Sequence, residues 1–218
     1  SIQKEEFKRL GVFGDWDNPY LTVNKDYEYA IVKSFAELVK KGYIYHGLKP
    51  VNWCFVCETA LAEAEVEYVD HTSPSIFVKF RLEDNQNFPK DTSLVIWTTT
   101  PWTLLANVAV AVHPGLSYSH IKTEHGDLII ADVRLQALSA IGIEKYEVIR
   151  TFKGKDLEGL IYEHPLGIRK GRVVLADYVS REEGTGLVHT APGHGLEDYS
   201  TGQKYKLETV MPVNVKGE

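Results

Sequence analysis

The 218-residue sequence predicts an α+β fold, in which a mostly β, barrel-like domain with peripheral helices follows a helical N-terminal segment. Three observations predict this class. Helical spacing and turn signals dominate the first 65 residues, and short apolar runs between turns begin at residue 66. The composition, 44% hydrophobic and 25% charged, is that of a globular protein able to bury a core. We therefore expect a helical and linker part over 1–65 and a β-rich domain over 66–218.

The N-terminal part predicts two helices joined by a loop. Residues 5–10 suit a short helix closed by Gly11, and the loop 15–24 is interrupted by Pro19. A stronger helix follows, with cations and then Gly42 at its end. We expect its apolar face to pack on the rest of the chain. That face comprises Tyr27, Ala30, Ile31, Ser34, Phe35 and Leu38.

Cys54 and Cys57 are the two cysteines of the chain, and they form a C-x-x-C unit. A redox pair of the thioredoxin type requires a preceding strand, which residues 49–52 predict only weakly. A zinc site requires four ligands, and no second C-x-x-C is present, although His46 or His71 could contribute. We favour an empty hairpin of the zinc-ribbon kind, and we expect neither a metal nor a cofactor.

The β-rich part predicts a series of short strands, interrupted by helices over 132–141, before Gly142, and near 196–206. Each predicted strand is an apolar run bounded by turn residues. These runs are 66–69, 75–80, 94–97, 108–112, 117–121, 128–130, 146–152 and 173–178.

Two segments differ from ordinary core sequence. At the end of the predicted strand 94–97, three threonines and Pro101 lie between Trp97 and Trp102. This pattern predicts a pocket in which hydroxyl groups project from the strand end between apolar walls. The second segment, 184–198, combines four glycines, two histidines and a terminal carboxylate, Asp198, as in a loop that approaches a ligand closely. The ordinary alternatives are an exposed strand with a turn and, for Asp198, a carboxylate that stabilises a helix N-terminus.

Two motifs in this chain resemble the editing domain of class I aminoacyl-tRNA synthetases. They are Trp-Thr-Thr-Thr-Pro-Trp-Thr over 97–103 and His-Thr-Ala-Pro-Gly-His-Gly over 189–195. Within that family, the two motifs are most similar to those of the isoleucyl type. Leucyl- and valyl-type relatives typically carry arginine at the position of Pro101 and lack the His-Thr-Ala-Pro motif. Supporting fragments such as Ala-Leu-Ala-Glu-Ala-Glu-Val-Glu-Tyr over 60–68 extend the resemblance along the chain. It implies that 1–65 joins the domain to the synthetase body.

The resemblance implies hydrolysis of valine from the isoleucine tRNA, with valyl-adenylate as a second substrate. A hydrophobic pocket that binds isoleucine rejects valine only weakly, because valine is smaller by one methylene, so a second, hydrolytic site is needed. The isoleucine enzyme is the standard example of this problem. Asp198 matches the residue that binds the substrate ammonium. The threonines match the residues that contact the aminoacyl ester and the attacking water, Trp102 forms a wall, and His189 limits the pocket and holds the terminal ribose. The implied catalytic residues are Asp198, Thr98, Thr99 and Thr100, and the implied substrate-binding residues are Trp102, Thr103, Asn107 and His189.

Neither a Ser-His-Asp nor a Cys-His set is evident, so the expected catalysis depends on orientation and electrostatics, with the ribose hydroxyl as proton carrier. The His-Ile-Gly-His and Lys-Met-Ser-Lys motifs of aminoacylation are not in the sequence. The net charge of −6 argues against broad contact with nucleic acid, but a single-stranded 3′ end of tRNA needs only a local groove.

The expected partners are that tRNA end and the remainder of the synthetase. We expect a monomer in the cytoplasm with no membrane contact, because no apolar run approaches ~18 residues and the first residues lack a signal peptide. Three alternatives remain open: an editing domain of the valyl or leucyl type, a non-catalytic module that binds an RNA end, and a redox protein.

Overall fold

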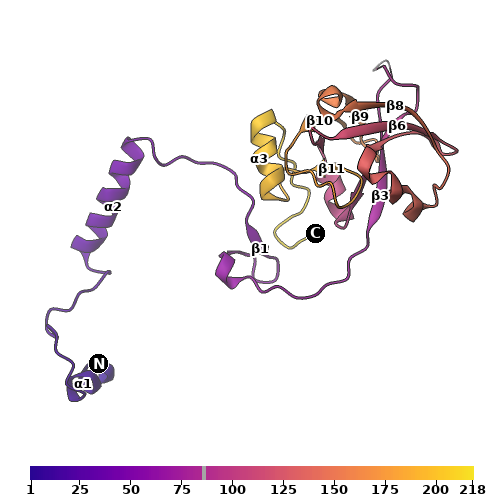
Figure 1. The fold of residues 1–218 in the computed structure, drawn as a ribbon. Helices are drawn as coiled ribbons and strands as arrows, with labels where there is room; N and C mark the ends of the chain where they lie inside the picture. Colours follow the sequence, from indigo (N-terminus) through magenta and orange to yellow (C-terminus); the bar gives the residue numbers. More distant parts are fainter. Residues whose placement is uncertain (85–86) are drawn as a thin grey trace. The chain divides into compact units, whose positions relative to one another are not determined.

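The structure is a computed structural model that describes residues 1–84 and 87–218. Two compact units follow each other along the chain, Ser1–Leu48 and Lys49–Glu218 (Figure 1). The C-x-x-C hairpin groups with the second unit, since Trp53 Nε1 donates to the carbonyl of Val215 at 2.8 Å. A division of the chain at residue 65 stays a prediction about domain organisation.

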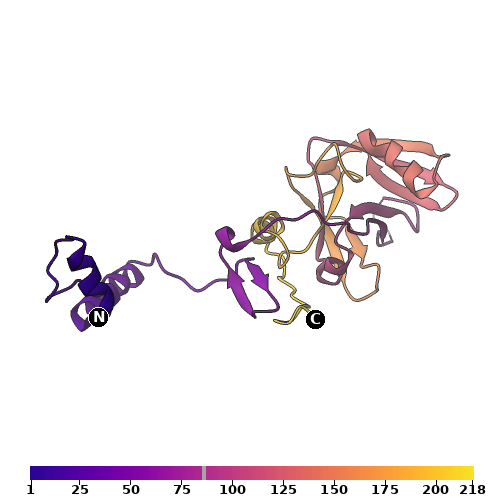
Figure 2. The same cartoon turned by 90° about the horizontal axis from the view of Figure 1, so that it is seen from below.

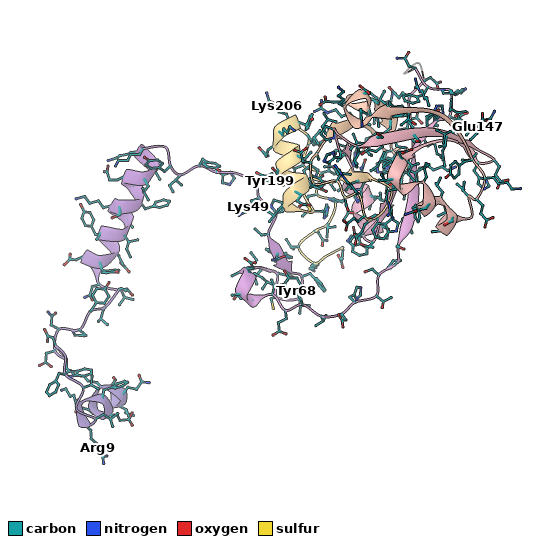
Figure 3. All side chains as sticks on the ribbon, viewed as in Figure 1. Arg9, Lys49, Tyr68, Glu147, Tyr199 and Lys206 are labelled. Atoms are coloured by element: carbon teal, nitrogen blue, oxygen red, sulfur yellow. The ribbon has the colours of Figure 1, made fainter. Side chains whose placement is uncertain are left out.

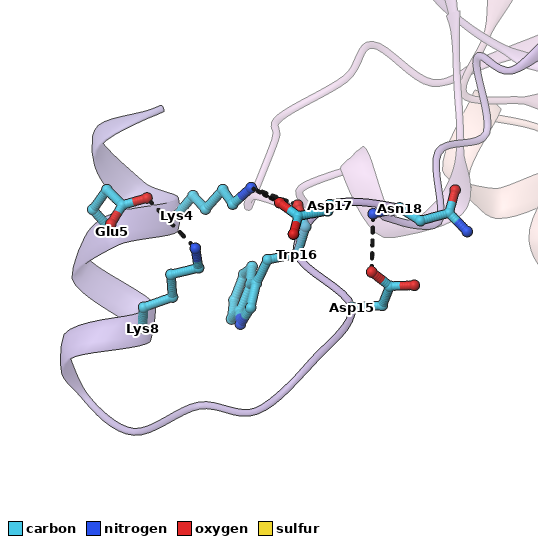
Figure 4. Close-up of polar contacts among 7 residues, drawn as sticks. All are labelled: Lys4, Glu5, Lys8, Asp15, Trp16, Asp17 and Asn18. Carbon is cyan, nitrogen blue, oxygen red and sulfur yellow. Dashed lines mark hydrogen bonds and ion pairs between the residues drawn. The ribbon is translucent and has the colours of Figure 1, made fainter.

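The first unit contains helices α1 (Ile2–Arg9) and α2 (Lys25–Lys40). Lys4 ties α1 to the following loop, because its ammonium donates to the carbonyl of Trp16 at 2.6 Å and to Asp17 at 3.4 Å (Figure 4). Both predicted helices are present. Within its own unit the apolar face of α2 is not covered, because no residue of the helix is buried and Phe35 is 53% exposed, so packing of that face on the rest of the chain stays a prediction. An amphipathic pattern identifies a helix but not the surface that covers it.

The second unit begins with the hairpin of β1 (Asn52–Cys54) and β2 (Thr59–Leu61), followed by the 3₁₀ turn η1 (Glu63–Glu65). Within the hairpin turn, the Cys57 N–H donates to Cys54 Sγ at 3.3 Å. The predicted strand 66–69 is wrong. That segment pairs with no strand in the described chain, and Tyr68 projects from it with 87% exposure (Figure 3).

A five-stranded sheet has the order β3-β4-β7-β6-β8. β4 pairs in parallel with β7 at only two positions, Ser93 and Leu94, whereas its later residues up to Thr98 stay paired with β3. The strands are β3 (Ile76–Arg81), β4 (Ser93–Thr98), β6 (Ser117–Thr123), β7 (Gly126–Ala131) and β8 (Glu147–Lys153).

A four-stranded sheet has the order β11-β5-β10-β9. Figure 2 shows this part of the chain from below. Its strands are β5 (Ala109–Val112), β9 (Ile161–Glu163), β10 (Lys170–Leu175) and β11 (Leu187–Thr190). The sequence did not predict β9 or β11 as strands, because runs of three or four residues carry too little periodicity.

The α+β class is confirmed, with the strands in several sheets and no closed barrel in the described part of the chain. The two large sheets meet at a bridge between Leu82 and Tyr162 and share a core that includes Phe80, Ile96 and Val110. The remaining elements are η2 (Pro101–Ala106), η3 (Asp132–Ile141), η4 (Gly154–Leu157) and α3 (Leu196–Tyr205). Within residues 1–84 and 87–218, we find no helix with the length and apolarity that a membrane span requires.

Candidate functional site

The threonine run lies at the end of β4, where that strand is still paired with β3 of the five-stranded sheet. Thr98 is the last residue of β4 and is buried, and its Oγ1 accepts the Thr100 N–H at 3.1 Å. The Oγ1 atoms of Thr98 and Thr100 are 3.2 Å apart. Thr99 is exposed, and its hydroxyl has no hydrogen-bond partner among the described residues. Of the three hydroxyls, that of Thr99 is therefore free for a ligand.

The 3₁₀ helix η2 begins at Pro101 and carries Thr103 to the second motif. Thr103 Oγ1 donates to the carbonyl of Thr100 at 2.8 Å and lies 3.0 Å from Nε2 of His189, the third residue of β11. Because the one hydroxyl proton of Thr103 goes to Thr100, Thr103 Oγ1 accepts the bond from His189 Nε2. A continuous chain of hydrogen bonds thus joins the two motifs.

His189 is a buried, neutral imidazole. Burial first, and then charge repulsion from His194 and His164, lower its pKa to about 4. Since Nε2 carries the ring proton, Nδ1 is an acceptor, and it is buried without a partner in the described chain. A buried unpaired acceptor is costly unless a ligand or water donates to it. The imidazole therefore keeps one buried acceptor unpaired beside the threonine cluster.

Asp198 lies in the first turn of α3, which follows the glycine-rich loop. Its Oδ2 accepts the Ala191 N–H at 2.8 Å, and its Oδ1 accepts the hydroxyl of Tyr178 at 3.2 Å. Burial raises the pKa of Asp198, against the lowering effect of these two donors and of His194. Each carboxylate oxygen can accept a further bond. Asp198 thus closes the loop after β11 and also keeps capacity for a cationic group.

The glycine turn before β11 allows close packing against the other sheet. Gly186 has a positive φ of +75°, and a Cβ at this position would lie 2.3 Å from the Cβ of Ala131. No side chain fits there, because Ala131 is fully buried at the end of β7. The turn therefore brings β11, with His189, against the sheet that carries the threonines.

The two remaining predicted residues, Trp102 and Asn107, have different surroundings from the six described above. Trp102 is 54% exposed on η2, as a wall residue with an open face would be. Asn107 has no exposed surface, and its amide is engaged in the interior: Nδ2 donates to Ala109 O at 2.8 Å, and Oδ1 accepts the Tyr162 hydroxyl at 2.6 Å. These contacts fix the start of β5. A substrate contact by Asn107 stays a prediction.

Sequence reasoning missed two polar residues at this site. Tyr178 donates to Asp198, and buried His164 donates from Nε2 to the carbonyl of Leu104 in η2 at 2.7 Å. Neither lies within the two motifs. Tyr178 ends a predicted strand and His164 precedes a proline, so the sequence contains no signal that assigns them to the site.

We find no cluster of three or more histidine, cysteine or acidic residues suited to a metal within the part of the chain that the structure describes. Two shallow hollows elsewhere contain none of the predicted site residues, and we assign no ligand to them. One is lined by residues around Lys122 and Tyr146, and the other by residues around Asn87 and Phe88.

Comparison with known proteins identifies the family. Residues 1–207 match the family described as tRNA synthetases class I (I, L, M and V). The chain belongs to this family. It is 57% identical over 217 residues to the isoleucine–tRNA ligase of Carboxydothermus hydrogenoformans, which covers 99% of the chain and 24% of that enzyme. The corresponding ligase of Fervidobacterium pennivorans is 56% identical, with 99% of the chain and 23% of the enzyme covered.

The fold of this class I synthetase segment is that of a solved editing domain. The crystal structure of the P. knowlesi cytosolic leucyl-tRNA synthetase editing domain aligns with a TM-score of 0.52 at 15% identity, covering 63% of this chain and 64% of that one. The resemblance read from the two motifs is therefore confirmed. The chain spans about a quarter of the length of the curated relatives it matches.

Proposed function

We propose that this segment hydrolyses valine from mischarged isoleucine tRNA, with valyl-adenylate as a second substrate. One observation carries the proposal. The hydrogen bond between Thr103 Oγ1 and His189 Nε2, at 3.0 Å, brings together two motifs that lie 86 residues apart. Motifs this far apart in sequence that share one polar cluster are typical of a site built by the fold. The whole-chain similarity to isoleucine–tRNA ligases supports isoleucine tRNA as the RNA.

Each polar group has a role that fits an aminoacyl ester. The Asp198 carboxylate takes the substrate ammonium in a partly buried setting, where charge-assisted bonds are strong. The free hydroxyl of Thr99 and those of Thr98 and Thr100 orient the ester and the attacking water. His189 Nδ1 accepts a hydroxyl of the terminal ribose, and its ring narrows the space so that isoleucine is excluded.

The ester is already activated, so the site needs only to position water and stabilise developing charge. A neutral His189 suits this role, because only the neutral ring has an acceptor nitrogen. Trp102 supplies an apolar wall, and Thr103 fixes the His189 ring. We expect the tRNA 3′ end and the remainder of the synthetase as partners. The apolar face of α2, which its own unit does not cover, is a surface for the latter.

The test is deacylation of valyl-tRNA for isoleucine by a synthetase that contains this segment, with Asp198→Asn as the variant. Loss of an ion pair with the substrate ammonium should lower the rate by roughly 10- to 100-fold, since a hydrogen bond to a charged group contributes about 1.5–3 kcal/mol. The Ala191 N–H keeps an acceptor in the variant, which protects the loop.

Glu197→Gln is the matched control, because Glu197 is the neighbouring acid in the same helical turn and is exposed. It should keep the wild-type rate. Equal rates for Asp198→Asn and wild type would remove Asp198 from the site. Tight binding of the tRNA end with no turnover in the wild type would favour the non-catalytic module instead.

A further inference from the structure

Two side chains from one turn hold the end of η2. His164 Nε2 donates to the carbonyl of Leu104 at 2.7 Å, and Arg169 Nη1 donates to the carbonyls of Leu105 at 2.6 Å and Asn107 at 3.1 Å. The last carbonyls of a short helix have few partners within the helix itself. The Leu104 carbonyl also accepts the Asn107 N–H at 2.9 Å, so His164 adds a second bond to it, and Arg169 satisfies the carbonyls of Leu105 and Asn107.

His164 and Arg169 are the ends of the β9–β10 turn. The His164 N–H donates to Arg169 O at 3.0 Å, and the Gly167 N–H donates to His164 O at 2.8 Å. His164 Nδ1 also accepts the Leu166 N–H at 3.1 Å. Because Nδ1 is an acceptor, Nε2 must carry the proton that reaches Leu104. The turn thus fixes its own shape and the tautomer of the histidine together.

Charge and burial agree with this arrangement. His164 is 2% exposed, and burial lowers its pKa, which keeps the ring neutral as both of its bonds require. Arg169 has no ion pair with a carboxylate among the described residues, so its guanidinium serves the carbonyls. A third bond from the same hairpin, Tyr162 to Asn107 at 2.6 Å, holds the residue that follows η2.

The held segment carries Thr103, which directly precedes Leu104. A shift of η2 would change the 3.0 Å separation between Thr103 Oγ1 and His189 Nε2. We propose that Arg169, with His164, is a positioning residue for the editing site: it holds η2 so that Thr103 keeps His189 in the Nε2-protonated tautomer and in its orientation. This inference rests on the proposed function.

The kinetic test uses Arg169→Met in a synthetase that contains this segment. A misplacement of about 1 Å can cost about 100-fold in rate, so we expect kcat for deacylation of valyl-tRNA to fall by roughly 10- to 100-fold with little change in KM. Combined with Thr103→Ala, the variant should be no slower than Thr103→Ala alone, because both act on the same contact. Arg169→Lys, which keeps the cation but not the planar fork, should show an intermediate loss.

Lys170→Met is the matched control, because it removes the adjacent cation, which pairs with Glu83 and does not contact η2. It should keep the wild-type kcat. If Arg169 bound tRNA phosphate instead, Arg169→Met would raise KM and weaken its dependence on salt with kcat unchanged, which would overturn the proposal. Unchanged kcat and KM would overturn it as well.

Nitrogen-15 NMR of the 218-residue chain separates this inference from the proposed function. The His189 Nε2–H signal should be present and slow to exchange in the wild type and in Lys170→Met, and should shift and exchange faster in Arg169→Met. An unchanged signal in Arg169→Met would refute the positioning role. A wild-type enzyme that does not hydrolyse valyl-tRNA would refute the proposed function, while the NMR result would still decide the role of Arg169 in holding Thr103 against His189.

Discussion

The buried imidazole of His189 makes a quantitative prediction about stability and pH. Its ordinary pKa is 6.5, and in the folded chain burial lowers it to about 4. Between these values the unfolded chain binds a proton that the folded chain does not, so the free energy of unfolding must fall as the pH falls. Integrating the linkage from pH 7 to pH 5 gives a loss of about 2 kcal/mol from this one residue.

His189→Gln isolates that loss, because glutamine keeps a hydrogen-bonding side chain but does not titrate. The measurement is urea unfolding of both chains at pH 7, 6 and 5, followed by circular dichroism. At pH 7 the wild type should be more stable, since His189 Nε2 bonds to Thr103 at 3.0 Å inside the core. The difference in unfolding free energy should then shift by about 2 kcal/mol toward the variant at pH 5.

Other acids and histidines titrate in both chains, so they cancel in the comparison. A difference that stays constant from pH 7 to pH 5 would refute a lowered pKa for His189. It would also remove the argument that the site works with a neutral imidazole.

Two further predictions concern neighbours of the site and the sheet that supports it. Tyr178→Phe removes a donor that lowers the pKa of Asp198, so the acidic limb of the deacylation profile should move to higher pH; an unmoved limb would contradict the role of Tyr178. Gly171→Ala places a Cβ 2.2 Å from the fully buried ring of Tyr162 and should cost about 1–3 kcal/mol in thermal or urea unfolding. Gly115→Ala is its control, since the added Cβ meets only ordinary contact at 3.5 Å, and equal losses in the two variants would contradict the packing argument.

The long elements were predictable because each has a local signal. α2 follows a helical apolar pattern with a glycine stop, and β4, β6 and β8 are strands of six or seven residues that overlap predicted runs bounded by turn residues. Short or unpaired segments were not predictable. Residues 66–69 look like a strand, but a strand needs a partner, and local sequence does not say whether one is near.

The site divides in a similar way. The threonine run and the glycine-flanked loop stand out in the sequence, because residue types so unusual for a core indicate chemistry. His164, Arg169 and Tyr178 carry no such signal. Their importance comes from partners that lie 20 to 64 residues away.

By itself, the sequence determined the α+β class, the order of the longer helices and strands, the family, and the two segments that bear the polar groups. All of these depend on local sequence patterns and motifs. Only the tertiary structure decided that the strands form separate sheets, that Thr103 meets His189, and that a turn between β9 and β10 holds η2 in place. The reason is physical. Hydrogen bonds and burial between distant residues depend on three-dimensional distance, and neighbours along the chain do not encode that distance.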